Sequence, residues 1–372
     1  MNNITALPDL QIGNIRINPP VIQGGMGVLV SGPGLVSAVS NAGALGILAA
    51  VGAGEDCEDR SLNYADRSSE GLRQMIAKTR SMTSNPFGIN IMCVLSNYVE
   101  LVRTAIEEKI SVIISGAGLP LSLPSLAVGS ETALVPVVST ARAADLICRT
   151  WKRRYDRLPD AIIVEGSKAG GHLGFSRDEI DSAPPELIDI VKDVIKVVKP
   201  YQVEGKATIP VIAAGGVFDG KDIATFMNVG AAGVQMGTRF VCTDECDASI
   251  EYKNSYVNCS EDDITIVQSP VGLPLRVVRN DFIKRIQAGG KDDFYCRYQC
   301  LRTCDPSKSS YCIADALKNA FDGNMNKGFT TCGANAYRIN KIVPVRELLN
   351  ELAEGCLEHL NPSLVESDLC TG

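Results

Sequence analysis

The sequence lacks the features that direct a chain into or across a membrane. No apolar run reaches the roughly 18 residues that a membrane-spanning helix needs. The nearest, residues 42–51, is short and interrupted by glycine. The first ten residues have no basic segment followed by an apolar one, so no secretion signal is visible. We therefore expect a cytoplasmic protein without a membrane partner.

Blocks of like charge are also missing. The net charge is −7, and acidic and basic residues are scattered along the chain. Such a balance argues against a nucleic acid or an anionic membrane surface as a partner. The one short basic stretch, residues 152–154 with Arg157, is typical of the solvated end of a helix.

Histidine is scarce in this chain, whereas cysteine is not. There are two histidines and 13 cysteines. An odd number of cysteines without a secretion signal indicates reduced thiols rather than a disulfide framework. Hydrophobic residues make up 45% of the chain, which is ample for a large core.

Short apolar runs recur through the first 240 residues, each followed by a glycine or small polar residue and then by an amphipathic stretch. The runs are rich in valine and isoleucine and mostly apolar throughout, which is typical of parallel strands buried on both faces. The eight runs are residues 20–23, 46–51, 87–92, 111–115, 133–139, 161–165, 210–214 and 233–236.

The stretches between the runs carry apolar residues at helical spacing. They predict helices over residues 69–82, 98–109, 141–155, 186–198 and 221–229. Between the fourth and fifth runs, residues 120–129 contain at most a short helix. Eight alternations predict an α/β fold, a (β/α)8 TIM barrel. The rival, a doubly wound open sheet, needs a G-x-G-x-x-G turn that residues 24–27 do not supply.

The pattern changes after residue 245. Residues 246–335 hold seven of the 13 cysteines and show no strand–helix period. We interpret residues 1–245 as the barrel and 246–335 as an additional Cys-rich, mainly helical subdomain, inserted or acting as a lid. Residues 336–372 contain an amphipathic stretch at 343–359, which predicts a C-terminal helix packed on the barrel.

The carboxyl ends of the predicted strands, where barrels form their active sites, are rich in glycine. Glycine lets the backbone approach a ligand closely and adopt positive φ. The seventh and eighth runs end in Gly215-Gly216 and Gly237-Thr238, and loops at these two positions commonly bind phosphate through main-chain N–H groups. The pair of ends therefore predicts a phosphate site.

The two histidines occupy different settings. His172 follows two glycines at the end of the sixth run, whereas His359 lies in the polar C-terminal helix. A neutral imidazole accepts a proton at physiological pH. We therefore predict that His172 is catalytic and that His359 is a surface residue.

Five short motifs, in this order and at these strand ends, resemble the nitronate monooxygenase family, formerly called 2-nitropropane dioxygenase, which includes enoyl-ACP reductase II. The motifs are residues 23–26, 87–90, 169–174, 213–216 and 235–240. The resemblance covers about residues 15–245 and resumes at 269–274 and 332–333. Lys168 departs from the family pattern, which often has an acidic residue there.

The resemblance implies a flavoprotein oxidoreductase that binds FMN without a covalent bond and has His172 as its catalytic residue. Gly25 and Met26 would face the flavin ring, Asn90 and Glu165 would contact it, and Gly170 would line the same pocket. The ribityl phosphate would lie against Gly215, Gly216, Gln235, Gly237 and Thr238. No residue is assigned as a metal ligand.

Two reactions on small-molecule substrates follow from the resemblance. A nitronate monooxygenase oxidises alkyl nitronates with O2 to a carbonyl compound and nitrite. The alternative is an NAD(P)H-dependent reductase of enoyl thioesters, with acyl carrier protein as an additional partner. A third hypothesis, from another class, is a flavin-binding barrel without turnover that senses redox state or binds partners through its cysteines. The resemblance leaves a homodimer open.

Four cysteines follow the pattern Cys296-x3-Cys300-x3-Cys304-x7-Cys312. Four thiolates suffice for Zn²⁺ or an iron–sulfur cluster, but the spacing matches no standard knuckle or cluster motif. On a helix the first three would share one face, which also suits buried thiols, because free cysteine packs as a small apolar residue. Buried thiols, a metal or cluster, and redox-active pairing all stay open.

Overall fold

The computed structural model describes residues 7–55, 57, 59, 61–201, 208–296 and 300–366. In this part of the chain eight parallel strands form a closed barrel with the neighbour order β10-β11-β3-β4-β5-β6-β7-β8, closed by the β8–β10 pair. The strands are β3 (Val21–Gln23), β4 (Leu45–Ala49), β5 (Phe87–Met92), β6 (Val112–Gly116), β7 (Ala133–Val138), β8 (Ile162–Glu165), β10 (Val211–Ala214) and β11 (Gly233–Met236). Each overlaps one predicted apolar run, so the TIM-barrel prediction is confirmed.

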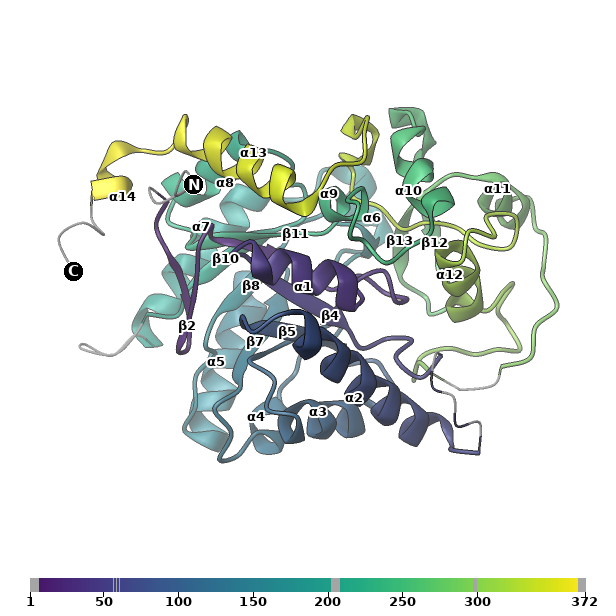
Figure 1. Cartoon of the computed structure of the whole chain (residues 1–372), viewed down its shortest axis with the longest axis horizontal. Coiled ribbons are helices and arrows are strands. Elements are labelled where there is room, and N and C mark those ends of the chain that lie inside the picture. Colours follow the sequence, from purple (N-terminus) through teal and green to yellow (C-terminus); the bar gives the residue numbers. More distant parts are fainter. Residues whose placement is uncertain are drawn as a thin grey trace.

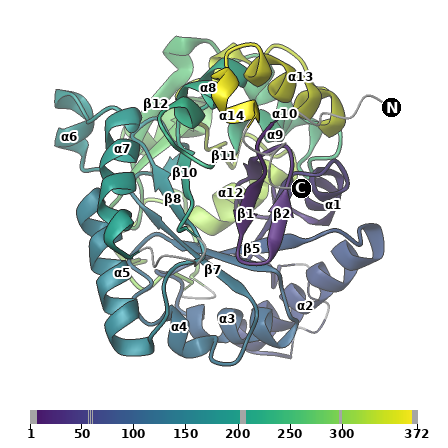
Figure 2. The same cartoon turned by 90° about the vertical axis from the view of Figure 1, so that its left-hand side faces the viewer.

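Helices surround the barrel, as Figure 2 shows. Five overlap the predicted helical stretches, and Pro124 lies in the single turn found between β6 and β7. Side-chain caps fix several starts: Thr140 accepts the Ala143 N–H, and Asp219 accepts the Asp222 N–H. The helices are α1 (Pro33–Asn41), α2 (Tyr64–Met82), α3 (Tyr98–Glu107), α4 (Leu123–Leu126), α5 (Ala141–Tyr155), α6 (Arg177–Ser182), α7 (Leu187–Val198) with the 3₁₀ turn η1 (Lys199–Tyr201), and α8 (Gly220–Asn228).

A β-hairpin covers one end of the barrel. Strands β1 (Leu10–Ile12) and β2 (Ile15–Ile17) pair antiparallel and place Leu10, Ile12 and Ile17 in the same buried cluster as the side chains inside the barrel. This cluster fills the barrel interior with branched aliphatic side chains. The hairpin lies over the amino-terminal end of the barrel, as Figure 2 shows.

The segment after residue 245 contains helices, as predicted, and also two strands. Strand β13 (Pro274–Val278) pairs antiparallel with β12 (Ile264–Gln268) and with β9 (Gly171–His172), which lies between β8 and α6 in sequence. Figure 1 shows this segment gathered at one end of the molecule. Its helices are α10 (Ile250–Val257), α11 (Asp281–Gln287) and α12 (Ile313–Phe321), preceded by α9 (Thr238–Val241) and accompanied by the turns η2 (Glu261–Asp263) and η3 (Ala336–Arg338).

One hydrophobic cluster spans the boundary proposed at residue 245. Leu35 and Trp151 of the barrel helices belong to the same cluster as Tyr252, Phe282 and Phe329 of the following segment. The segment therefore packs against the barrel as part of its core. That residues 246–335 form an inserted or lid subdomain stays a prediction.

The predicted C-terminal helix is present as α13 (Val345–Leu357), followed by α14 (Pro362–Glu366). Helix α13 lies against α8, as Figure 1 shows. The contact needs glycine at residue 220, because a Cβ there would lie 2.3 Å from the main-chain nitrogen of Cys356. Within the described residues, none of the helices is both long and apolar enough to span a membrane.

Candidate active site

A cavity of about 870 Å³ lies at the carboxyl ends of the barrel strands. Its barrel side includes the ends of β3, β5, β6, β7, β8, β10 and β11. Its outer side consists of the β9–β13–β12 sheet, α12 and residues 331–333. All eleven predicted site residues line this one cavity, namely Gly25, Met26, Asn90, Glu165, Gly170, His172, Gly215, Gly216, Gln235, Gly237 and Thr238. Their individual roles stay predictions.

Backbone conformation at the end of β10 supplies the first part of the site. Gly215 and Gly216 have φ of +84° and +113°, in the region that side-chain-bearing residues rarely adopt. A Cβ on Gly216 would also lie 3.0 Å from the Cβ of Lys168. The loop therefore depends on glycine, and it leaves the backbone open toward the cavity.

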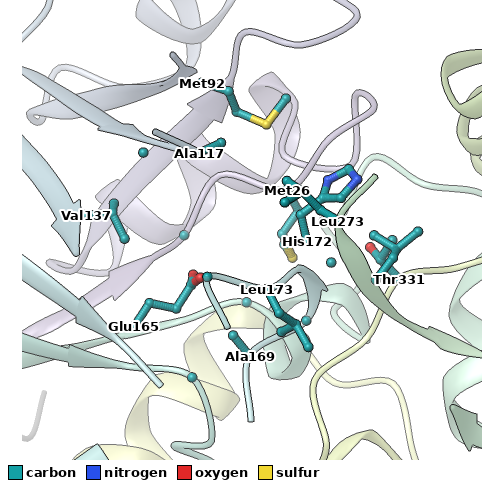
Figure 3. Close-up of a pocket in the computed structure, with 18 of the residues that line it drawn as sticks. Met26, Met92, Ala117, Val137, Glu165, Ala169, His172, Leu173, Leu273 and Thr331 are labelled. Carbon is teal, nitrogen blue, oxygen red and sulfur yellow. The ribbon is translucent and has the colours of Figure 1, made fainter. Parts of the chain in front are cut away.

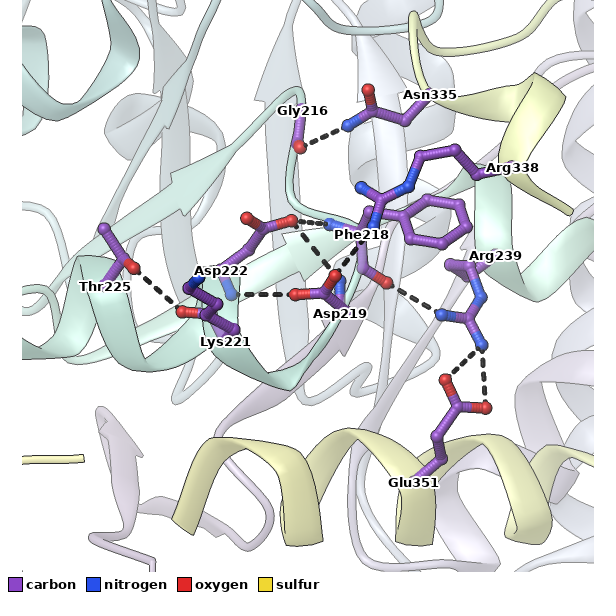
Figure 4. A network of polar contacts seen from close by, with 10 residues as sticks. All are labelled: Gly216, Phe218, Asp219, Lys221, Asp222, Thr225, Arg239, Asn335, Arg338 and Glu351. Carbon is purple, nitrogen blue, oxygen red and sulfur yellow. Dashed lines mark hydrogen bonds and ion pairs between the residues drawn. The ribbon is translucent and has the colours of Figure 1, made fainter. Parts of the chain in front are cut away.

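A network of polar contacts holds this loop from behind, as Figure 4 shows. The side-chain amide of Asn335 donates to the carbonyl oxygen of Gly216 at 2.7 Å, and Arg338 pairs with Asp219 at 2.8 Å. Arg239 donates to the carbonyl oxygen of Phe218 and pairs with Glu351 of α13. The guanidinium carbons of Arg338 and Arg239 lie 4.0 and 4.6 Å from the centre of the Phe218 ring. The positive charges of Arg239 and Arg338 are thus used in positioning the loop.

Gln23 at the end of β3 and Gln235 in the neighbouring β11 differ in whether their side-chain amides are hydrogen-bonded. Gln23 is fully buried: its side-chain nitrogen donates to Ser31 and its oxygen accepts the Ile47 N–H at 3.1 Å. Gln235 reaches over Gly24 and lines the cavity. In the described structure the buried Oε1 atom of Gln235 has no hydrogen-bond partner. An unpaired buried amide oxygen is costly, so it marks a place for a ligand donor.

Glu165 and Asn90 place polar groups on the barrel side. Figure 3 shows the Glu165 carboxyl pointing into the cavity from the end of β8. Burial raises the pKa of Glu165 to about 7, so near neutral pH the carboxyl is a donor as well as an acceptor. Asn90 keeps its position only because residue 25 is glycine, since a Cβ there would lie 2.5 Å from the Cβ of Asn90.

His172 lies on the outer side of the cavity, in the direction of Leu273 and Thr331 in Figure 3. Strand β9 holds its backbone by pairing with Leu275 of β13. Its Nε2 atom lies 3.1 Å from the hydroxyl oxygen of Ser269. Burial lowers the pKa of His172 to about 4, so the imidazole is neutral at physiological pH.

Two residues that support His172 were missed by sequence reasoning. Ser269 holds the imidazole, and the buried Arg276 donates to the carbonyl oxygens of Ser167 (2.8 Å) and Ala169 (2.5 Å), which fixes the loop before His172. Both lie about a hundred residues downstream of that loop. The motif at 269–274 included Ser269, but a lone serine or arginine carries no spacing signal that would reveal such contacts.

Lys168, the departure from the family pattern, lies at the rim of the cavity. Its side chain is exposed, and its Nζ atom lies 3.6 Å from the exposed carboxylate of Glu186. Exposed pairs of this kind contribute little to stability. The cation thus faces solvent at the cavity entrance.

The fold and this cavity define a barrel enzyme whose site lies at the carboxyl ends of the strands, with glycine loops suited to a phosphorylated cofactor. The chain belongs to the nitronate monooxygenase family, whose model matches residues 9–101 and 94–355. Enzymes of this family are oxidoreductases and are flavin-dependent in general. The sequence resemblance is therefore confirmed.

Proteins similar to this chain carry different names. The chain is 31% identical over 286 residues to a Rhodococcus jostii protein named (3aS,4S,5R,7aS)-5-hydroxy-7a-methyl-1-oxo-octahydro-1H-indene-4-carboxyl-CoA dehydrogenase, covering 77% of this chain and 69% of the relative. It is 27% identical to a probable nitronate monooxygenase of Staphylococcus aureus, covering 90% and 96%. The structure of FabK from Thermotoga maritima matches with a TM-score of 0.71 at 30% identity, covering 92% and 94%.

Proposed function

We propose that this protein is an FMN-dependent nitronate monooxygenase that oxidises alkyl nitronates with O2 to a carbonyl compound and nitrite. The observation that carries the proposal is the placement of a neutral His172 opposite a glycine-lined pocket with an unpaired Gln235 oxygen. The family match and the Staphylococcus aureus relative support the same reaction. We further propose that the protein acts in the cytoplasm.

The residues of the barrel side fit FMN. Main-chain N–H groups at Gly215, Gly216, Gly237 and Thr238 would bind the ribityl phosphate. Gln235, Asn90 and Glu165 would contact polar groups of the cofactor, with Gly25, Met26 and Gly170 along the ring. When bound, the flavin supplies the electron transfer that no side chain of the protein provides.

His172 would handle the substrate proton. Ser269 occupies Nε2, so Nδ1 is the nitrogen available to accept a proton from the carbon next to the nitro group of a neutral nitroalkane. Because the pKa of His172 is lowered to about 4, the ring is unprotonated throughout the neutral range and has a free lone pair for a proton. Toward a nitronate, which is already an anion, the ring would orient the substrate instead.

A second candidate is oxidoreduction of an acyl thioester, including NAD(P)H-dependent reduction of an enoyl thioester. The outer side of the cavity favours it, because Leu173, Leu273, Leu301, Ile313 and Leu317 form an apolar wall suited to an acyl chain. The name of the Rhodococcus jostii relative contains a CoA thioester, which supports the same substrate class. In this case a CoA or acyl carrier protein conjugate would be the partner.

Product analysis separates the two candidates. The purified, FMN-loaded protein is incubated in air with propyl-2-nitronate, or with crotonyl-CoA and either NADH or NADPH. Nitrite released in proportion to nitronate, without nicotinamide cofactor, is the result expected for the monooxygenase. Consumption of NAD(P)H that depends on crotonyl-CoA, with no nitrite from nitronate, would replace it by the thioester reaction. Sedimentation of the same sample tests whether the protein is a homodimer.

A further inference from the structure

Residues 332–335, called here the 332–335 segment, connect parts of the chain that lie far apart in the sequence. The Cys332 N–H donates to the carbonyl oxygen of Arg276 in β13 at 3.2 Å, and the Ala334 N–H donates to that of Lys168 at 3.0 Å. Both donors belong to the main chain. The segment is therefore held by its backbone between β13 and the loop after β8.

Two glycines let this segment approach the cavity closely. A Cβ on Gly170 would lie 2.6 Å from the carbonyl carbon of Cys332, and a Cβ on Gly333 would lie 2.8 Å from the Oγ1 atom of Thr238. Real side chains do not make contacts this short, so the packing depends on glycine at both positions. The 332–335 segment therefore packs directly against Gly170 and Thr238, two of the residues that we propose to contact the flavin.

Asn335 fixes the peptide unit that follows Gly216. Its side-chain amide donates to the carbonyl oxygen of Gly216 at 2.7 Å, as Figure 4 shows. The peptide bond between Gly216 and Val217 is trans, so its carbonyl oxygen and its N–H point in opposite directions. Asn335 lies outside the cavity lining, whereas Val217 belongs to it. The Val217 N–H is therefore directed toward the cavity.

The hydroxyl group of Thr238 is oriented by the same segment. The Gly333 N–H donates to the Thr238 Oγ1 atom at 2.9 Å. A hydroxyl oxygen that accepts a hydrogen bond still has its own hydrogen to donate. Within the part of the chain that the structure describes, no protein atom accepts this hydrogen. Because Thr238 lines the cavity, its hydroxyl hydrogen is available to an anion there.

The two donors follow the neighbouring strands β10 and β11. The Val217 N–H has no acceptor among the described residues, whereas the next N–H, that of Phe218, donates to the Asp222 carboxylate at 2.9 Å. Phosphate oxygens only accept hydrogen bonds, and they bind donors of this kind strongly because of their charge. The carbonyl oxygen of Gly216, which would repel a phosphate, is turned away and bound to Asn335.

We propose that Asn335 is a positioning residue for the phosphate of FMN and that, together with Gly333, it directs the Val217 N–H and the Thr238 hydroxyl hydrogen at that phosphate. The inference rests on the proposed FMN site and adds Val217 to its donors. Without the Asn335 amide, the peptide after Gly216 is free to rotate and to present its carbonyl oxygen to the anion. Riboflavin has the same ring and ribityl chain without the phosphate, so its binding should not depend on Asn335.

Fluorescence titration of the flavin-free protein with FMN and, separately, with riboflavin tests the proposal. Asn335→Ala should weaken FMN binding about tenfold and riboflavin binding less than about twofold, because the lost hydrogen bond acts on a charged group that only FMN has. Asn335→Asp is close to asparagine in shape but cannot donate, so it should weaken FMN binding as the alanine variant does. Thr238→Val should also weaken FMN binding selectively, and Thr238→Ser, which keeps the hydroxyl, should restore it.

Asn280→Ala serves as the matched control. The Asn280 amide makes the same kind of bond, to the carbonyl oxygen of Gly328 at 2.7 Å, but Asn280 lies outside the cavity lining. The variant should lose thermal stability and keep both flavin affinities. Thermal unfolding followed by circular dichroism shows which variants are folded, and the Thr238 pair decides the question if neither Asn335 variant folds.

Two results would overturn the proposal. One is wild-type FMN affinity in a folded Asn335→Ala or Thr238→Val variant, and the other is an equal loss of FMN and riboflavin affinity. None of these readouts depends on turnover. A protein that binds FMN in this way but releases no nitrite would therefore reject the proposed reaction and support this inference, whereas a wild type that binds no FMN would overturn both.

Discussion

The two sides of the cavity are constructed in different ways. On the barrel side the ligand surface is largely backbone, set by positive φ at Gly215 and Gly216 and by strand ends that the barrel fixes in place. On the outer side the surface consists of side chains, with His172 and Ser269 joined across about a hundred residues of sequence. The barrel side therefore suits a constant cofactor, whereas the outer side can change with the substrate.

The largest expected effect on turnover comes from removing the His172 side chain on the outer side of the cavity. With a neutral nitroalkane as substrate, His172→Ala should lower kcat at least about 100-fold, because a positioned proton acceptor commonly contributes that much. Flavin content should stay at the wild-type level, since His172 lies on the outer side of the cavity and the proposed flavin contacts lie on the barrel side. His359→Ala is the control, because His359 is exposed at the end of α13. Equal rates for both variants would remove His172 from the mechanism.

Glu165 tests the barrel side through stability. Its pKa is about 7 in the fold against 4.5 for an ordinary glutamate, so the folded state favours the protonated form. The resulting stabilisation is complete below pH 4.5 and is lost as the pH rises through about 7. In the flavin-free protein, Glu165→Gln should not show this loss. Its free energy of unfolding relative to wild type should therefore be about 2 kcal/mol higher at pH 8 than at pH 4.5, allowing for solvent screening.

Urea unfolding at the two pH values measures this difference. Glu354→Gln, on the exposed face of α13, is the control and should change stability equally at both. If Glu165→Gln followed the wild-type pH dependence, the carboxyl would be solvated and would not be a group held for the flavin.

A substitution at Gly216 tests whether the main chain forms the ligand surface on the barrel side. Gly216→Ala places a Cβ at φ of +113° and 3.0 Å from Lys168, so the loop must shift. Strain of about 1–2 kcal/mol corresponds to roughly tenfold weaker FMN binding, measured by fluorescence titration. Gly272→Ala is the matched control: its φ is +82°, but the added Cβ meets no atom within 4 Å. Equal loss of FMN affinity in the two variants would contradict a cofactor loop at Gly216.

The smallest effect is expected at Ser269. Ser269→Ala removes the group that holds Nε2 of His172, and a single hydrogen bond corresponds to about a two- to tenfold change. The loss should fall on kcat/KM with flavin affinity unchanged. Ser309→Ala, in the Cys-rich segment, supplies a comparison, because Ser309 lies outside the cavity lining. An unchanged kcat/KM would show that β9 alone positions the imidazole.

The barrel could be predicted because its strands are apolar along most of their length. Residues 87–92 and 112–116 are buried on both faces, and such runs have one common structural use. Helix α1 was not predicted, since its sequence PGLVSAVSN is rich in small residues and lacks an amphipathic pattern. Strand β13 was missed because Arg276 interrupts an otherwise apolar run, although that arginine is buried and bonded to the loop before His172.

The site could likewise be predicted only in part. The eleven predicted residues line one cavity because each stands at or just after a strand end, where the barrel topology gathers them. The partner of His172 and the unpaired oxygen of Gln235 could not be foreseen, since both depend on how distant segments pack. Periodicity reports which residues are buried, and tertiary contacts alone report which polar atoms remain unpaired.

One spectroscopic titration tests the central claim most directly. Visible absorption of the purified, FMN-loaded protein is recorded without oxygen, first after addition of NADH and then, in a separate sample, after addition of propyl-2-nitronate. We predict that the flavin bands bleach with nitronate alone and are unchanged by NADH. Bleaching by NADH without any response to nitronate would contradict the monooxygenase, and failure to take up FMN at all would contradict the barrel-side assignment.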